Sequence, residues 1–248
     1  MTMRTVAIIQ ARMGSTRLPG KVLAELGGAT MLAQVVRRVR EAARVTDVVV
    51  ATTTATDDDA VVREAERLGA CVHRGPEADV LARFVGAARA VSADAIVRLT
   101  ADCPLLDAGV IDQVVGALGA AVDYASNTHD RTFPRGLDVE ALHRDTLERI
   151  ARLGTSPSAR EHVTAFVMEA PGLFRIAQVR AERDDSDLRW TVDTPDDLAM
   201  VRALYRELDL ASVARPYRDV VAAVRARPEL AQANAHVIQK PWQVSHVR

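Results

Sequence analysis

The chain has 248 residues, of which 48% are hydrophobic, and its 32 Lys plus Arg nearly balance its 33 Asp plus Glu. A net charge of −1 excludes the basic excess with which proteins coat nucleic acid, so we expect no nucleic-acid partner. Two cysteines, Cys71 and Cys103, cannot build a disulfide framework, and no apolar run approaches the roughly 18 residues of a membrane span. The apolar stretch Val6 to Ile9 is too short for a signal-peptide core. We therefore predict a cytoplasmic protein without a membrane partner.

Short β-branched runs alternate with amphipathic stretches along residues 5–100. The predicted strands are Thr5–Ile9, Val45–Ala51, Ala70–His73 and Ala95–Thr100. The predicted helices between them are Met31–Ala43, Asp58–Leu68 and Asp79–Val91. This alternation predicts a mostly parallel sheet covered by helices on both faces. Ligands of such sheets bind beyond the carboxyl ends of the strands, so the loops that follow the strands should converge on one site.

The second half of the chain is less regular. Its predicted extended segments are Asp123–Asn127, Gly136–Ala141 and Arg175–Arg180, and its predicted helices are Arg144–Leu153 and Ala159–Met168. A further helix should begin after Thr194 as N-cap, with Pro195 in its first turn, and run to about Leu208. Because no repeat or linker divides the sequence, we predict one domain, with a main unit of residues 1–210 and an accessory extension of residues 211–248 packed on it.

The segment after the first predicted strand, Gln10 to Lys21, carries charges and glycines in place of core residues. Three cations, Arg12, Arg17 and Lys21, flank the Gly14-Ser15-Thr16 stretch. Consecutive backbone N–H groups can form an anion nest while the cations neutralise charge, and a triphosphate needs both. The spacing matches neither a Walker motif nor Gly-x-Gly-x-x-Gly, which argues against a P-loop kinase and a dinucleotide dehydrogenase. On spacing alone, a solvated basic loop remains the alternative.

This segment resembles the nucleotide-binding signature of the cytidylyltransferases that activate acidic sugars, such as CMP-KDO synthetase and CMP-sialate synthetase. It is most similar to the SpsF-type spore-coat polysaccharide branch, which has Gln-Ala-Arg where the KDO enzymes have Pro-Ala-Arg. The resemblance implies the A-type nucleotide-diphospho-sugar transferase fold, a Rossmann-like three-layer α/β sandwich whose mostly parallel twisted sheet has an antiparallel portion. It implies that the nucleotide contacts Gln10, Ala11, Arg12, Met13, Gly14, Ser15, Thr16, Arg17, Lys21, Arg74 and Thr100. For Arg74, a surface charge is the alternative.

Two carboxylates are candidate metal ligands. Asp102 follows the predicted strand Ala95–Thr100, and Asp193 precedes the capped helix. On position alone, either could be a turn or capping residue, but both fall in segments that resemble the family's metal-binding motifs. The resemblance therefore implies that they hold Mg²⁺, which prefers hard oxygen ligands. We attribute Asp196 and Asp197 to the helix dipole, and Cys103 to packing. The KDO enzymes have a base-reading Gln at the position of Thr100, so that marker of cytosine is absent here.

Several polar residues of the second half lie in segments that are also similar to the SpsF branch. We predict that they bind the acceptor: Asn127, His129, Arg135, Asp138, Glu140, Arg160 and His162. Arg135 could make a bidentate contact to a carboxylate or a phosphate. For His129 and His162, a structural hydrogen bond is the alternative.

The predicted function is the transfer of CMP from CTP to a small acidic sugar or related anion, with release of pyrophosphate. We predict that Arg12, Lys21, Asp102 and Asp193 catalyse this reaction. The reaction would belong to surface polysaccharide or specialised-metabolite biosynthesis, and the resemblance implies that the enzyme is a homodimer. The alternatives are a glycosyltransferase of the same fold that uses a nucleotide sugar, a nucleotidyltransferase for a phosphonate or sugar phosphate, and a non-catalytic nucleotide-binding protein.

Overall fold

The structure, a computed structural model, describes residues 3–170 and 172–239. Within this part, seven strands form one sheet in the order β5-β4-β1-β6-β8-β7-β9. The strands are β1 Thr5–Gln10, β4 Asp47–Thr53, β5 Cys71–Gly75, β6 Ala95–Thr100, β7 Tyr124–Ser126, β8 Glu140–His143 and β9 Ile176–Gln178. All neighbouring pairs are parallel except those that β8 makes with β6 and β7. The predicted mostly parallel sheet with an antiparallel portion is confirmed.

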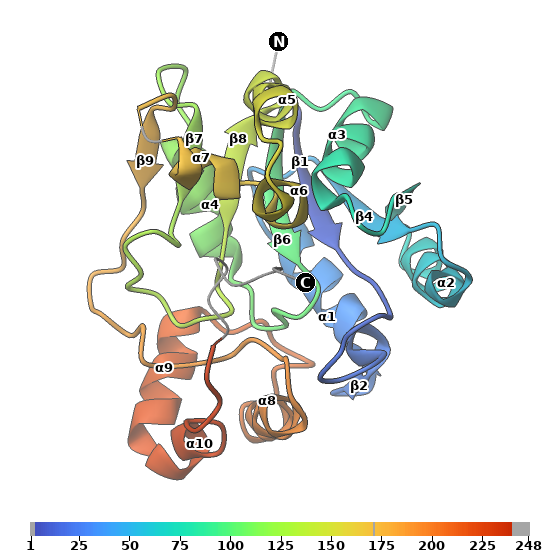
Figure 1. The fold of residues 1–248 in the computed structure, drawn as a ribbon. Helices are drawn as coiled ribbons and strands as arrows, with labels where there is room; N and C mark the ends of the chain where they lie inside the picture. The colour runs from blue at the N-terminus through green and yellow to red at the C-terminus, as the bar shows by residue number, and fades with distance from the viewer. Residues whose placement is uncertain (1–2, 171, 240–248) are drawn as a thin grey trace.

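Helices cover both faces of this sheet, because the side chains of β1 alternate between two apolar clusters. Ala7 and Ile9 face the larger cluster, to which α1, α2, α4, α8 and α9 contribute, whereas Val6 and Ile8 face a smaller one formed with α3, α5 and α7. Figure 1 shows the three layers that result. The helices are α1 Met31–Arg40, α2 Asp59–Arg67, α3 Val80–Ala90, α4 Ala108–Ala117, α5 Arg144–Leu153, α6 Pro157–His162, α7 Ala165–Glu169, α8 Pro195–Glu207, α9 Tyr217–Ala226 and α10 Pro228–Gln232.

Polar N-caps fix where several of these helices begin. Asp79 accepts a hydrogen bond from the Ala82 N–H at the start of α3, and Thr194 forms a reciprocal capping box with Asp197 at the start of α8. Asp107 accepts one from Val110 and starts α4, a helix that the sequence analysis missed. Short 3₁₀ turns at Lys21–Leu23 and Thr56–Asp58 and a small hairpin, β2 Glu25–Leu26 with β3 Ala29–Thr30, complete the first half.

Two predicted elements of the second half are wrong in extent. The helix expected over residues 159–168 is two short helices, α6 and α7, because the backbone of the buried Val163 adopts a positive φ of 60° between them. This break brings the Thr164 hydroxyl to the buried carboxylate of Glu140. The segment expected to be extended over 136–141 enters the sheet only at Glu140.

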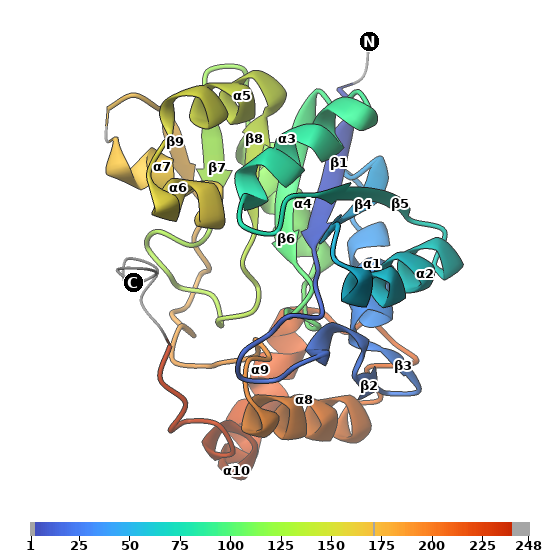
Figure 2. The same cartoon turned by 45° about the vertical axis from the view of Figure 1, so that its right-hand side comes forward.

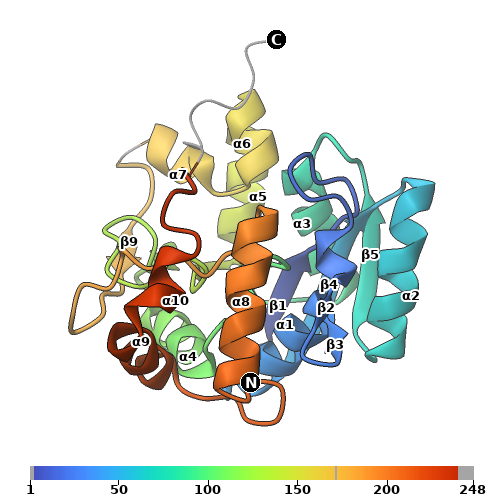
Figure 3. The same cartoon turned by 90° about the horizontal axis from the view of Figure 1, so that it is seen from below.

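The C-terminal region returns to the carboxyl ends of the strands. In α9, Tyr217, Val220 and Val224 belong to the same apolar cluster as α8, and Figure 3 shows α9 and α10 beside α8. The last nine residues of the predicted extension, 240–248, lie outside the described residues. Along the parts that the structure does describe, none of the helices combines the length and the apolar composition that crossing a membrane requires.

Candidate active site

The loop between β1 and Lys21 is folded onto itself and tied to the sheet. The carbonyl of Met13 accepts hydrogen bonds from the N–H groups of Ser15 and Gly20, at 2.9 and 3.0 Å. Gly20 has φ +69°, a left-handed conformation that glycine adopts without strain. Figure 2 shows this loop, in dark blue, running from the end of β1 to a position beside α8. The cations of the loop are thereby carried to the edge of the sheet where the strands end.

Asp58, which the sequence analysis did not single out, anchors the loop. Its buried carboxylate accepts the N–H of Met13 at 2.7 Å and both the N–H and the hydroxyl of Thr53 at the end of β4. Burial would raise the pKa of Asp58, but these hydrogen bonds outweigh it and lower the pKa. The sequence signal was a Thr-Asp-Asp-Asp run just after a strand.

The central feature of the site is a cation surrounded by three oxygens. The Lys21 Nζ lies 2.7 Å from Asp102 Oδ2, 2.9 Å from Asp193 Oδ1 and 2.7 Å from the carbonyl oxygen of Val192. Burial would lower the pKa of Lys21, but the charges of Asp102 and Asp193 outweigh it, so the pKa is raised. Two carboxylates 91 positions apart in the sequence are thus held by one ammonium group.

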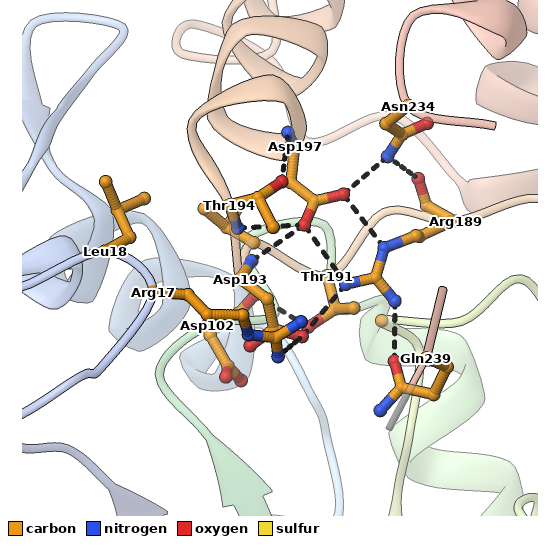
Figure 4. A network of polar contacts seen from close by, with 12 residues as sticks. Arg17, Leu18, Asp102, Arg189, Thr191, Asp193, Thr194, Asp197, Asn234 and Gln239 are labelled. Carbon is orange, nitrogen blue, oxygen red and sulfur yellow. Dashed lines mark hydrogen bonds and ion pairs between the residues drawn. The ribbon is translucent and has the colours of Figure 1, made fainter. Parts of the chain in front are cut away.

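Arginines hold the second oxygen of Asp193. Arg17 from the loop and Arg189 each lie near Asp193 Oδ2, at 3.1 and 2.9 Å (Figure 4). Burial would raise the pKa of Asp193, but Lys21 and the two arginines lower it. Arg189 also pairs with Asp197, whose side chain is fully buried. The helix dipole alone therefore does not account for Asp197, because this carboxylate accepts hydrogen bonds from Arg189 and from the backbone of Asp193 and Thr194.

A pocket of about 270 Å³ opens beside this cluster. Val22 and Ala101 line it together with eleven of the residues predicted from the sequence: Gln10, Ala11, Arg12, Gly14, Ser15, Thr16, Arg17, Lys21, Thr100, Asp102 and Asp193. A larger hollow of about 510 Å³ lies between α3 and α5, but it shares no lining residue with the pocket and has Glu148 as its sole carboxylate. The smaller pocket is the candidate active site, because the loop and the paired carboxylates meet there.

The loop presents unoccupied backbone donors to this pocket. The N–H groups of Ala11, Met13 and Ser15 are hydrogen-bonded within the protein, whereas those of Arg12, Gly14 and Thr16 have no such partner among the described residues. The side chain of Arg12 pairs with the exposed Glu77 at 2.9 Å. Free N–H groups together with nearby cations are what an anion such as a phosphate requires.

Two residues predicted to contact the nucleotide do not line the pocket. The Met13 side chain packs against the larger apolar cluster. The Arg74 guanidinium lies 2.6 Å from Asp59 Oδ1 and donates to the carbonyls of Thr53 and Ala55. Arg74 thus stabilises the backbone at the end of β4.

The residues predicted to bind the acceptor are not gathered around the pocket. Three of them are occupied in structural contacts. Asn127 is buried and bonded to the backbone of Leu137 and Val139, and Glu140 is buried with Arg98 and Tyr124. The third, Arg160, pairs with the helix cap Asp79 and lines the larger hollow.

The remaining four acceptor candidates differ in how far they are engaged. Asp138 is held by both terminal nitrogens of Arg131, and the ring of His129 packs on Tyr124 with the centroids 5.5 Å apart. Burial lowers the pKa of His129. His162 ends α6. Arg135 is half-buried, and its guanidinium has no hydrogen bond or ion pair within the described part of the chain.

Arg135 nevertheless lies close to the carboxylate cluster. Its backbone pairs with the segment around Arg189, accepting from the Trp190 N–H and donating to the Leu188 carbonyl. A side chain on Gly136 would collide with the Trp190 backbone, so only glycine permits this approach. Burial, together with the charge of Arg131, lowers the pKa of Arg135.

The oxygens around Lys21 also form a donor set for a divalent cation. Asp102, Asp193 and the Val192 carbonyl provide hard oxygen ligands around one positive charge. No cluster of three or more His, Cys, Asp or Glu side chains suited to a metal occurs in residues 3–170 and 172–239. A site with two carboxylates fits Mg²⁺, which keeps several waters and takes substrate phosphates as its remaining ligands. Burial raises the pKa of Cys103, so its thiol stays protonated.

A mostly parallel sheet whose pocket gathers free amides, cations and two carboxylates provides the groups that nucleotidyl transfer requires. Residues 6–221 match the family model described as cytidylyltransferase, and the chain belongs to this family. The protein is thus a CTP-dependent nucleotidyltransferase, as the sequence analysis predicted.

Similar proteins agree with this assignment. The spore coat polysaccharide biosynthesis protein SpsF of Bacillus subtilis is 37% identical over 208 residues, covering 81% of this chain and 85% of SpsF. A 3-deoxy-manno-octulosonate cytidylyltransferase of Anaeromyxobacter dehalogenans is 34% identical and covers 82% of this chain and 98% of its own. The solved structure of a cytidylyltransferase from Leptospira borgpetersenii has a TM-score of 0.88 at 32% identity, over 96% of this chain and 100% of its own.

Proposed function

We propose that this cytidylyltransferase transfers CMP from CTP to a small acidic sugar or related anion, with Mg²⁺ held by Asp102 and Asp193. The observation that carries the proposal is the set of three oxygens around the Lys21 ammonium, adjoining a loop with free amides. This pairing of a cation site with an anion cradle suits a metal-bound triphosphate. Apart from the Val192 carbonyl, both halves come from residues that were predicted from the sequence.

In the proposed reaction, an acceptor oxygen attacks the α-phosphorus of CTP in line. The new acceptor O–P bond forms as the bond between the α-phosphorus and the bridging oxygen breaks, and pyrophosphate leaves with that electron pair. Where the acceptor oxygen is a hydroxyl, its proton is released to solvent. Arg12, Arg17 and Lys21 neutralise charge on the phosphates, and the N–H groups of Gly14 and Thr16 orient them. Mg²⁺, when bound, supplies Lewis-acid stabilisation of the phosphate oxygens.

The acceptor is proposed to be an anion because of Arg135. Its half-buried guanidinium has no hydrogen bond or ion pair with the protein among the described residues, and burial already lowers its pKa. A carboxylate or phosphate on the acceptor would satisfy it with two parallel hydrogen bonds. The names of two relatives, a spore coat polysaccharide biosynthesis protein and a sugar-acid cytidylyltransferase, support an acidic sugar and a role in surface polysaccharide or specialised-metabolite synthesis. We also infer a homodimer, which light scattering would test.

A pyrophosphate-release screen tests the proposed function. The four nucleoside triphosphates would be crossed with sugar acids, sugar phosphates and phosphonates in the presence of Mg²⁺. We expect release with CTP and a sugar acid, loss of release on addition of EDTA, and loss in Asp102→Asn. Asp196→Asn is the matched control, because Asp196 is an exposed carboxylate near the same site. Transfer from a ready-made nucleotide sugar without pyrophosphate release would contradict the proposal.

A further inference from the structure

The last described residues of the chain return to the active site. At the end of α10 and beyond it, the residues at 232, 233, 235 and 236 are exposed, but Asn234 is only 2% exposed. Asn234 lies beyond residue 221, where the match to the family model ends. Figure 4 shows its amide pointing toward Arg189 and Asp197, next to the carboxylates of the site.

Both N–H groups of the Asn234 amide are used. The Nδ2 donates to Asp197 Oδ1 at 2.8 Å and to the backbone carbonyl of Arg189 at 3.1 Å. Asp197 Oδ1 also accepts from Arg189 Nε, at 2.9 Å. A buried carboxylate requires such donors to remain charged, and together they lower its pKa against the effect of burial.

The contacts continue from Asp197 to the candidate metal ligand. Asp197 Oδ2 accepts from the Asp193 N–H at 3.0 Å and from an Arg189 terminal nitrogen at 3.1 Å. The same nitrogen donates to Asp193 Oδ2 at 2.9 Å. Arg189 also donates to Gln239 Oε1, at 2.6 Å. The backbone and the carboxylate of Asp193 are therefore both fixed by a pair of side chains that the C-terminal segment holds.

We propose that Asn234 is a positioning residue that sets Asp193 for metal binding through Arg189 and Asp197. The C-terminal segment would then be a functional part of the active site, although it lies outside residues 6–221, which match the family model. The inference rests on the proposed function, because it assigns Asp193 to the metal. The observations that carry it are the burial of Asn234 within an exposed segment and its two hydrogen bonds into the network.

Asn234→Ala should make the position of the Asp193 carboxylate less fixed, although it replaces neither of the candidate metal ligands Asp102 and Asp193. Asp197 would lose one donor, and the Arg189 backbone would lose its tie to the segment. Substitutions behind a metal ligand typically weaken metal affinity by about 10- to 100-fold, and we expect about tenfold here. The free amides of the Gln10–Lys21 loop should be unaffected, because the hydrogen bonds of Asn234 in the described part of the chain go to Arg189 and Asp197.

Mn²⁺ serves as the probe, since the EPR signal of free Mn²⁺ measures binding without turnover. The full-length protein would be titrated with and without CTP, and melting curves would confirm folding. His236→Ala is the matched control, because His236 makes an exposed contact to Asp196 in the same helix turn and none to Arg189. If Asn234→Ala does not fold, Gln239→Ala removes another contact of the segment to Arg189 at an exposed position and should weaken Mn²⁺ binding by more than the change of about twofold that is allowed to the control; a smaller change would overturn the inference.

We expect weaker Mn²⁺ binding in Asn234→Ala with a cooperative melt, and binding within about twofold of the natural protein in His236→Ala. Equal Mn²⁺ affinity in folded Asn234→Ala and in the natural protein would overturn the inference and leave the proposed function intact. Equal loss in both variants would also overturn it. Absence of Mn²⁺ binding by the natural protein would contradict the proposed function and this inference together.

Discussion

Replacing Lys21 by methionine tests whether the ammonium group holds the two carboxylates together. Methionine keeps much of the apolar stem but removes the charge between Asp102 and Asp193. The three side chains are 10%, 25% and 15% exposed, so their charges are partly shielded from water. The two carboxylate oxygens lie 2.7 and 2.9 Å from Lys21 Nζ, so they are at most about 5.6 Å apart. At this separation and an effective dielectric constant of about 20, their repulsion is about 3 kcal/mol.

The arginines that remain at Asp193 offset part of this repulsion. We therefore expect a loss of about 2 kcal/mol in the free energy of unfolding, between the roughly 0–1 kcal/mol of an exposed pair and the roughly 3–5 kcal/mol of a broken buried pair. For a chain of this length, that is a fall of about 4–8 °C in Tm. Arg12→Met is the matched control, because the Arg12 pair with Glu77 is exposed and should contribute little to stability.

A divalent cation should affect the stability of the natural protein and of Lys21→Met differently. In the natural protein the cation competes with Lys21 for the carboxylate oxygens. In Lys21→Met it has no competitor and relieves the repulsion between Asp102 and Asp193. Mn²⁺ should therefore raise the Tm of the variant more than that of the natural protein, as measured by calorimetry. The kcat/KM for CTP should still fall by about 10²–10³-fold, because the phosphates lose a cation. A variant as stable as the natural protein without metal, or equal Tm gains from Mn²⁺, would refute this reasoning.

Three other predictions follow from the site. Arg12→Ala should raise the KM for CTP about tenfold, and Glu77→Ala should lower it, because Glu77 now occupies the guanidinium; steady-state kinetics showing equal effects would contradict this. Gln10→Ala should raise the KM for CTP about tenfold at unchanged Tm, since the buried Gln10 Oε1 has no partner in the described protein to lose; an unchanged KM would exclude a contact of Gln10 to the nucleotide. The pKa of Asp197 is lowered from 3.8 in the folded protein, so its contribution to stability is complete above about pH 4 and is lost as the pH falls through the lower pKa of the folded state. The free energy of unfolding in urea should therefore depend less on acid pH in Asp197→Asn than in the natural protein. An identical pH dependence would contradict the lowered pKa of Asp197.

Local sequence signals predicted the parallel half of the sheet and the principal site residues. The β-branched run before Gln10 and the capping box at Thr194 act over a few residues, so their outcome depends little on the rest of the fold. Asp102 and Asp193 came from motif resemblance, and the sheet topology brings them to one ammonium group. The missed helix α4 did have a signal, namely Asp107 followed by apolar residues at helical spacing.

The remaining parts depend on contacts between distant positions, which a single sequence does not display. Asp58 meets Met13 across 45 positions, and Asn234 meets Asp197 across 37. Burial also changed the interpretation of polar residues, because the buried Glu140 of β8 is hydrogen-bonded to Arg98 and Tyr124 in the two neighbouring strands. Motif resemblance locates such residues but does not reveal whether their side chains are free.

Phosphorus NMR of a single reaction tests the central claim most directly, namely that Asp102 and Asp193 serve a site where CMP is transferred from CTP. With CTP, Mg²⁺ and the acceptor found in the screen, we predict that the α-phosphorus appears in a CMP-linked product as pyrophosphate accumulates in equal amount. Asp102→Asn should give neither signal while melting as a folded protein. Product formation by Asp102→Asn at the natural rate, or a product formed without pyrophosphate, would contradict the account.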